Sequence, residues 1–318
     1  MADVDLTGLI GTNPLGFLAA LGALDVTTRR LPDTRLTLAW TDGLEPTARL
    51  TGPDSLDHLI DLCDTDRQRW ADSLILTWGP GKQPMADLKP DPETELIPWL
   101  NAILAAMTPD DRRDVDLIAA LLSEGALAGK GVSKPTHLHF TAGKQLFLVM
   151  ARALQEDLKP ADLREAFTGP WRYASTLPIL RWDPSGERVY AHTSRAPEST
   201  KATGVPGADW LAFVGLRHFP VTTGGAALLT TGCSPEWKRG EFRWPLWNAP
   251  ATSRVIMSLL AHPDLTKMTQ PQRELFSVHR LLAAPIRRTD QGGYGSFGAP
   301  TDLPPAPTHT ALATSPTP

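Results

Sequence analysis

Apolar positions recur at helical spacing near the start of the chain, over residues 14–24. Thr12 or Asn13 suits the cap of this helix, and Pro14 suits its first position. Glycines and alanines keep the helix slim. We therefore expect it to be buried and packed closely on several sides.

A hairpin and a helical layer follow this first helix. Residues 35–41 and 45–51 alternate apolar and polar positions around an Asp-Gly turn signal, which predicts the hairpin. From residue 55 to residue 126 the pattern is mostly helical, and its acidic residues fall on the polar faces and caps. This part predicts a solvated helical layer.

Within residues 133–154 the spacing of apolar positions changes from every second residue, as in a strand, to about every 3.6 residues, as in a helix. Residues 137–140 alternate like a short strand, Thr141 suits a helix cap, and the apolar positions from Leu146 onward are helical. A helix N-terminus attracts anions, and Lys144 lies beside this one in sequence. The segment is interpreted either as a phosphate contact or as an ordinary capped turn.

The remaining pattern predicts short elements rich in strands. In chain order we predict a helix over 160–167, a strand, turn and strand over 172–196, a buried helix over 209–216, a hairpin of 226–233 with 240–247, closing helices over 251–260 and 272–283, and a disordered tail after about residue 299.

The predicted fold class is therefore α+β, with an acidic helical layer, a basic β-rich half with hairpins, closing helices and a disordered C-terminal tail. The predicted divisions are a mainly helical acidic half over residues 1–128, a basic α+β half over 129–290, and a largely disordered tail rich in Gly and Pro over 291–318.

Charge supports this division of the chain. Residues 1–128 carry 10 Lys and Arg against 21 Asp and Glu, a balance of −11, and residues 129–318 carry 21 against 14, a balance of +7, which together give the net charge of −4. A polyanion could approach the second half and a basic protein surface could dock on the first, unless solvated charges merely cluster.

The composition indicates the class of protein and the compartment in which we expect it. The 318 residues are 42% hydrophobic and 21% charged, which is typical of a soluble globular protein. Ten tryptophans are many for this length, and we expect most of them in the core. Cys63 and Cys233 lie far apart, and neither an N-terminal signal nor an apolar run of membrane-spanning length occurs. We therefore expect a cytoplasmic protein with no membrane partner.

Motifs for catalysis are missing from the sequence. The glycine–lysine pairs lack P-loop spacing, and no nucleophile elbow or zinc-protease helix occurs. His137 and His139 share a predicted strand face, which indicates either half of a metal site or, without a third ligand nearby, two exposed imidazoles. We predict no catalytic residues, metal or cofactor.

Basic and aromatic residues alternate in the second half of the chain, and this mixture suits a groove that follows phosphates and stacks bases. The alternative is aromatic residues in the core with arginines reaching outward. The candidate nucleic-acid-binding residues are Lys134, Lys144, Gln145, Arg181, Arg188, Arg195, Lys201, Trp237, Lys238, Arg239 and Arg243, and the neighbouring aromatic residues are Trp171, Tyr173, Trp182, Tyr190 and Trp244.

Four segments together resemble one family. Residues 13–24 (NPLGFLAALGAL) are similar to the N-terminal N-P-x-x-F-x-A-x-x-G-x-L stretch of the Csb-type, large-subunit-like proteins of type I-U (I-G) CRISPR interference complexes. Residues 140–145 (FTAGKQ) resemble their W-A-G-x-Q element, with Phe-Thr where that family tends to carry tryptophan. Residues 211–219 (LAFVGLRHF) resemble their L-A-x-x-G-L-x-x-F helix, and residues 244–250 (WPLWNAP) their closing W-x-x-P segment.

The resemblance implies a non-catalytic subunit of an RNA-guided DNA-targeting complex. In such complexes guide pairing reads the sequence, while protein contacts read the flanking motif and the backbone. The implied partners are the crRNA, the target DNA and the other effector subunits. The alternatives are a scaffold subunit without direct nucleic-acid contact, and an enzyme with an unrecognised site.

Overall fold

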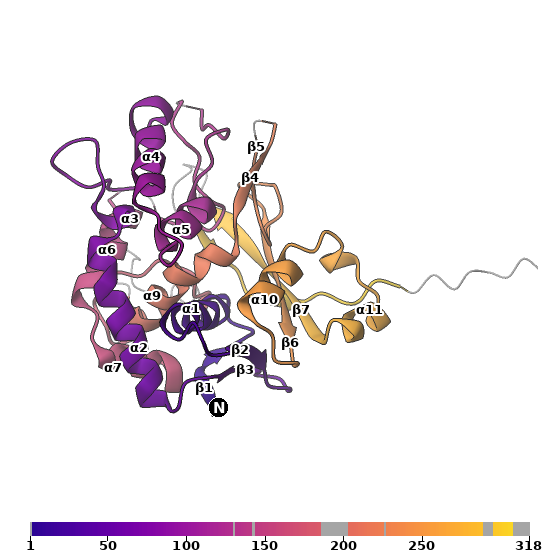
Figure 1. Cartoon of the computed structure of the whole chain (residues 1–318). Helices are drawn as coiled ribbons and strands as arrows, with labels where there is room; N and C mark the ends of the chain where they lie inside the picture. The colour runs from indigo at the N-terminus through magenta and orange to yellow at the C-terminus, as the bar shows by residue number, and fades with distance from the viewer. Residues whose placement is uncertain are drawn as a thin grey trace, which may run out of the picture.

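Helix α1 (Pro14–Arg30) lies near the centre of the fold, between a larger group of helices and a part that holds most of the strands (Figure 1). The structure is a computed structural model that describes residues 2–129, 131–141, 144–185, 203–225, 227–288 and 295–307. Asn13 caps α1 by accepting a hydrogen bond from the backbone N–H of Leu15, and every residue from Pro14 to Thr27 is buried. The predicted slim, buried helix is confirmed.

Short helices form the larger side of the molecule. Over the described residues, the further helices are α2 (Leu56–Arg69), α3 (Leu74–Thr77), α4 (Ile97–Ala106), α5 (Arg113–Leu121), α6 (Phe147–Asp157), α7 (Pro160–Thr168), α9 (Pro206–Gly215), α10 (Ser253–Leu260) and α11 (Gln270–Leu275), with shorter helical turns η1 (Trp70–Asp72), η2 (Pro92–Leu96), η4 (Leu216–His218) and η5 (Leu265–Lys267).

The strands make three small sheets in the described part of the chain. The first has the order β1-β3-β2, the second pairs β4 with β5, and the third has the order β6-β7-β8 with β9 beside β7. Their bounds are β1 (Asp3–Ile10), β2 (Thr37–Trp40), β3 (Thr47–Thr51), β4 (Val221–Gly224), β5 (Ala227–Thr230), β6 (Glu241–Trp247), β7 (Val278–Arg288), β8 (Gly295–Phe297) and β9 (Thr301–Asp302). The fold is therefore α+β, as predicted.

The backbones of α1 and α9 meet at two glycines. A Cβ atom added at Gly22 would lie 1.8 Å from the carbonyl oxygen of Leu211, and one added at Gly215 would lie 2.3 Å from that of Leu18. No side chain fits between helices at this distance. The two helices belong to segments that carry the family resemblance, so these motifs build the core.

An aromatic cluster surrounds Phe17 of α1. Its ring centroid lies 5.7 Å from that of Trp40, 5.9 Å from that of Trp244 and 6.2 Å from that of Trp247. The indole of Trp244 donates a hydrogen bond to the carbonyl of Gly11. Strands from both ends of the chain thus pack on one helix. Seven of the ten tryptophans are buried, which confirms their predicted place in the core.

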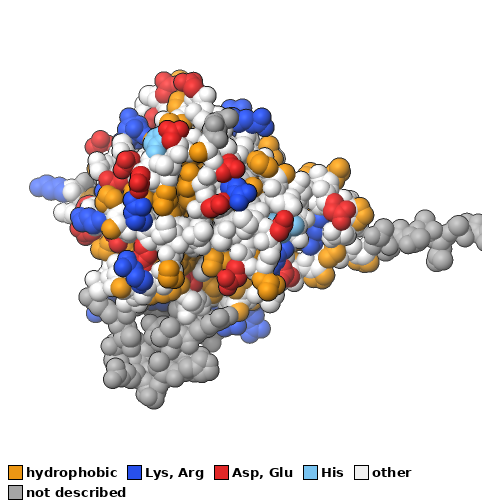
Figure 2. Space-filling model, turned by 90° about the horizontal axis from the view of Figure 1, so that it is seen from below, with side chains coloured by type: hydrophobic (Ala, Val, Ile, Leu, Met, Phe, Trp, Pro, Cys, Tyr) orange, Lys and Arg blue, Asp and Glu red, His pale blue; other side chains and the backbone are white. Residues whose placement is uncertain are grey.

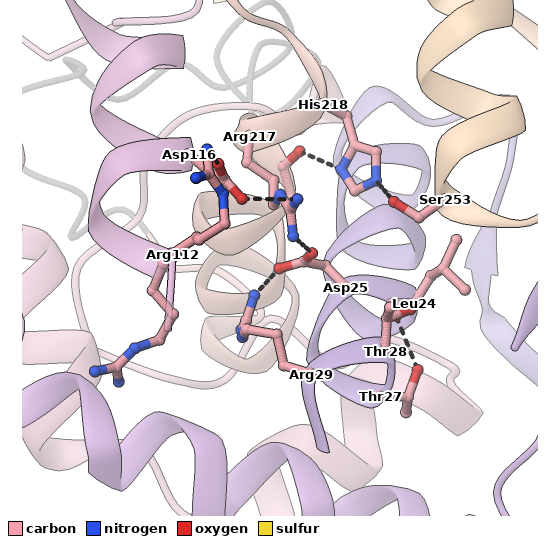
Figure 3. A network of polar contacts seen from close by, with 12 residues as sticks. Leu24, Asp25, Thr27, Thr28, Arg29, Arg112, Asp116, Arg217, His218 and Ser253 are labelled. Carbon is pink, nitrogen blue, oxygen red and sulfur yellow. Dashed lines mark hydrogen bonds and ion pairs between the residues drawn. The ribbon is translucent and has the colours of Figure 1, made fainter. Parts of the chain in front are cut away.

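A buried network of ions joins α1 to its neighbours (Figure 3). The carboxylate of Asp25, which is fully buried, contacts the guanidinium groups of Arg29 and Arg217. Arg29 also pairs with Asp66 of α2 at 2.7 Å, and Arg217 pairs with Asp116 of α5 at 2.9 Å. Arg217, from the second half of the chain, therefore neutralises part of the charge of Asp25 and Asp116, from the first half.

The hydrophobic core is continuous across residue 128, because one cluster holds residues of α1, α2, α6, α9, β6 and β7. On the face of the molecule in Figure 2, acidic and basic side chains are interspersed with apolar ones. This face is not a surface of a single sign. The division of the chain at residue 128 stays a prediction.

Other predicted elements are confirmed by the structure. The hairpin of residues 35–51 forms from β2 and β3, which pair antiparallel with Ala39 opposite Arg49. The helices predicted over 160–167, 209–216 and 251–260 correspond to α7, α9 and α10.

Two of the predicted long-range arrangements are wrong. The closing helix over 272–283 is a short helix, α11, followed by β7, and β7 rather than β5 is the main partner of β6. β5 pairs with β4, and a single bridge between Cys233 and Phe242 joins the segments expected to form a hairpin. A run such as Leu281 to Ala284 favours a helix by propensity, but burial on both faces stabilises it as a central strand.

Three local predictions are also corrected. Residues 137–140 are not a strand, and the first two of them lie in a turn. The strand expected between residue 172 and the turn at 183 does not form, since within the described residues 172–185 Ser175 alone makes a bridge, to Gly204. The strand expected after that turn lies outside the described residues. Residues 295–307, which were expected to belong to the disordered tail, include β8 and β9.

We predict that Gly22→Ala lowers the free energy of unfolding by about 1–3 kcal/mol, because the added methyl group must push α9 away from α1. Urea unfolding measures the change. Gly81→Ala is the control, since an added Cβ there meets no atom within 4 Å. Equal stability of the two variants would contradict close contact between the helices.

Candidate nucleic-acid interface

The loop between β5 and β6 carries three of the residues predicted to bind nucleic acid. The backbone N–H of Ser234 donates to the carbonyl of Glu241, which closes the loop at its base. Lys238 and Arg239 are exposed at the tip, and Trp237 is half-buried behind them. The predicted position of these residues at a tip is confirmed, although the strands around it pair differently.

Arg288, the last residue of β7, fixes the position of this loop. Its guanidinium group donates to the backbone carbonyls of Trp237 at 3.2 Å, His139 at 2.7 Å and His137 at 2.7 Å. The same group lies 3.9 Å from the centroid of the Trp237 ring. Burial lowers the pKa of Arg288 to about 10, so the side chain remains a cation at neutral pH.

Lys134 adds a second cation to this cluster. Its Nζ lies 4.9 Å from the centroid of the Trp237 ring. Burial first, and then the charge of Arg288, lower the pKa of Lys134. Within the described residues neither Lys134 nor Arg288 forms an ion pair, so their positive charge has no carboxylate partner. The arrangement favours an anionic ligand.

A cavity of about 350 Å³ opens beside these two cations. Ser133 lines it and is fully buried, and its hydroxyl has no hydrogen-bond partner in the described part of the chain. Lys89 and Thr141 lie on the other walls. A buried hydroxyl without a partner is costly unless a ligand or water binds it. We call this cavity, with Lys134, Arg288 and Ser133, the cationic pocket.

Asp87 is an acidic residue next to the cationic pocket, and its carboxylate is paired with other groups of the chain, His139 and Lys89. Burial opposes ionisation of this carboxyl, but the hydrogen bond and charge of His139, at 2.7 Å, together with the charge of Lys89, hold its pKa at about 2. The carboxylate also accepts from the backbone N–H of Phe147 at 3.3 Å. Asp87 therefore occupies the N-terminus of α6.

A second, wider cavity of about 640 Å³ shares Arg288 with the cationic pocket. Lys238, Arg239 and Arg287 line it together with Glu241. Glu241 pairs with Arg243 at 2.9 Å. The cations of the loop and of the end of β7 thus border two adjoining hollows, which we call the cationic face.

The structure brings together four of the predicted binding residues: Lys134, Trp237, Lys238 and Arg239. Gln145 accepts a hydrogen bond from Arg181 at 3.0 Å, which places this pair together but outside both cavities. Arg243 lies in β6 and is ion-paired. Lys144 is exposed and lines neither cavity, and Arg188, Arg195 and Lys201 lie outside the described residues.

The prediction of an anion site at Lys144 is not supported by the local geometry. Helix α6 begins at Phe147 after Leu146, not at Thr141, and the free N–H groups of its first turn donate to Asp87 and to the carbonyl of Ala86. A carboxylate and a carbonyl of the chain itself occupy the place expected for a phosphate.

The aromatic residues differ from the predicted base-stacking set. Trp182 and Trp244 are buried, and their indole groups donate to backbone carbonyls. Arg288 already lies over the ring of Trp237, so this ring holds cations in place rather than offering an open face to a base. Tyr190 lies outside the described residues.

His137 and His139 are buried, which corrects the expectation of exposed imidazoles. Nδ1 of His137 contacts the hydroxyl of Thr230 at 2.9 Å, and burial lowers the pKa of His137 to about 4. Over the described ranges, no group of three or more His, Cys, Asp or Glu side chains could hold a metal ion.

Arg288, Arg287 and Lys89 were missed by sequence reasoning. Arg288 is the residue on which the pocket depends, and its partners are about 50 and 150 residues away in sequence. The pair Arg287-Arg288 after the buried run of β7 is the one local signal that could have indicated it.

Comparison with known proteins adds no relative: no protein-family model and no curated protein matches this chain. No helix among the described residues combines the length and the apolar character needed to cross a membrane.

We predict that Arg288→Lys lowers the free energy of unfolding by about 1.5–3 kcal/mol, because an ammonium group cannot reach three carbonyls in the geometry of the guanidinium fork. Arg239→Lys, at the exposed tip, is expected to change it by less than about 0.5 kcal/mol. Thermal or urea unfolding of both variants checks this. An equal loss of stability in both variants would contradict the role of Arg288 in fixing the position of the loop.

Proposed function

We propose that this chain binds the phosphate backbone of nucleic acid through the cationic face. The observation that carries the proposal is the pair of cations Lys134 and Arg288 beside the buried hydroxyl of Ser133. Neither cation has a carboxylate partner among the described residues. A phosphate oxygen accepts hydrogen bonds from ammonium and hydroxyl donors alike, and it would neutralise this charge. Lys238 and Arg239 extend the positive charge along the neighbouring hollow.

Such a surface recognises the backbone and not the bases. Contacts to phosphate fix the position of a protein on nucleic acid and carry no sequence information directly. Because the ring of Trp237 is covered by Arg288, base stacking contributes little here. This accords with a subunit whose specificity comes from a paired guide strand.

The family resemblance adds a proposal about the complex in which the chain acts. We propose a non-catalytic subunit of an RNA-guided, type I CRISPR DNA-targeting complex in the cytoplasm, in contact with target DNA, the crRNA and other effector subunits. The four segments that carry the resemblance are mostly core segments, so they support the fold relationship more than they support the binding residues.

A scaffold role is the second candidate, and the surface of α4 favours it. Ile97 and Leu104 of this helix are 43% and 55% exposed, and Met107, directly after its last residue, is 38% exposed. Exposed apolar side chains gathered on one element are typical of a protein-binding surface. The two roles are compatible, since a subunit can hold a partner by one face and nucleic acid by another.

We predict that Lys238→Ala with Arg239→Ala flattens the salt dependence of binding to duplex DNA by roughly two units of log K per log salt, since each phosphate contact contributes about 0.9. The full chain and a fluorescent duplex are titrated at several salt concentrations by anisotropy. The control is Lys82→Ala with Lys267→Ala, two exposed cations away from the cationic face. Equal slopes in the two double variants, or no binding by the unmodified chain, would contradict the proposal.

A further inference from the structure

A separate cavity of about 230 Å³ lies at the N-terminal end of α9. Its apolar walls are Leu15, Ile179 and Val205, and its polar groups include Asp183 and Asp209. It shares no lining residue with the cationic pocket. Two carboxyl groups and one cation, Arg181, are among its lining residues, so its charge differs from that of the cationic pocket.

Asp209 is buried in this cavity with one oxygen open. Only 2% of the residue is exposed, and Oδ1 accepts a hydrogen bond from the backbone N–H of Leu180 at 2.9 Å. Among the described residues Oδ2 has no hydrogen-bond or ion-pair partner. A carboxyl group in this position would gain from a donor that enters the cavity.

The neighbouring Asp183 is already satisfied by the protein. Its oxygens accept from the side chain of Asn13 at 3.2 Å, the backbone N–H of Ser185 at 2.9 Å and the hydroxyl of Tyr173 at 2.7 Å. Asp183 therefore holds the wall of the cavity in place, and its charge disfavours an anion there. Burial and then this charge raise the pKa of Asp209 to about 8.

We propose that the cavity binds a small organic cation, an ammonium or amidinium group on an apolar body. An N–H of the ligand donates to Oδ2 of Asp209, and its apolar part lies against Leu15, Ile179 and Val205. The apolar walls disfavour a strongly hydrated inorganic cation. The two carboxyl groups outnumber Arg181, the one cation among the described lining residues, and this disfavours an anion. This site is independent of the proposed nucleic-acid function.

Benzamidine is the probe, with benzamide as its neutral analogue of the same shape. We expect calorimetry on the full chain to detect benzamidine binding with a Kd in the millimolar range or tighter, and benzamide to bind at least tenfold more weakly. Asp209→Asn should weaken benzamidine binding at least tenfold, whereas Asp54→Asn, an exposed carboxyl, should not change it. No binding of benzamidine, or equal binding of benzamide, would overturn the proposal.

The unmodified chain provides a second readout that does not require a variant to fold. The cation needs ionised Asp209, so its affinity should rise by about tenfold per pH unit as the pH approaches 8 and then level off. The other titratable groups lining the cavity are Asp183, Tyr173 and Arg181, and burial raises the pKa of Tyr173 beyond this range. Affinity that does not change between pH 6 and pH 8 would overturn the assignment to Asp209.

Discussion

The contact between the backbones of α1 and α9 at Gly22 and Gly215 is the constraint on which the rest of the structure depends. On the same helix, Phe17 packs against Trp40 of β2 and against Trp244 and Trp247 of β6. Segments from the start, middle and end of the chain thereby form one core. A longer distance between the two helices would open voids along their contact.

Two partly buried cations, Arg217 and Arg288, connect this core to the surface in different ways. Arg217 meets Asp25 and Asp116, so its charge is neutralised inside the fold. Arg288 instead donates to three backbone carbonyls and keeps its charge without a carboxylate. The first arrangement is structural. The second also holds a loop in place, and it leaves positive potential at a cavity where an anion can bind.

Much of the fold could be predicted from the sequence because its signals are local. The cap at Asn13, the proline at the first helical position and the small residues of α1 all lie within one segment, and the turn of the β2–β3 hairpin does as well. The pairing of β6 with β7 could not be predicted in the same way. It depends on contacts about 40 residues apart, and the Leu-Ala run of β7 favours a helix locally.

The candidate site could be predicted only in part, for the same reason. Lys134, Trp237, Lys238 and Arg239 are identifiable as cations and an aromatic residue in loops. Their meeting point is Arg288, whose place depends on long-range strand pairing. Asp209 and Asp87 could not be singled out from the sequence, because nothing in their local sequence distinguishes them from solvated acids. Their burial and their specific partners in the fold shift their pKa values.

The most direct test of the central claim is lysine footprinting on the full chain with and without single-stranded and duplex DNA. An amine-reactive reagent labels accessible lysines, and mass spectrometry reads each position. The account predicts that DNA protects Lys134 and Lys238, while Lys82 and Lys267 keep their reactivity. Equal protection at all four positions, or protection at Lys82 and Lys267 alone, would contradict a nucleic-acid interface at the cationic face.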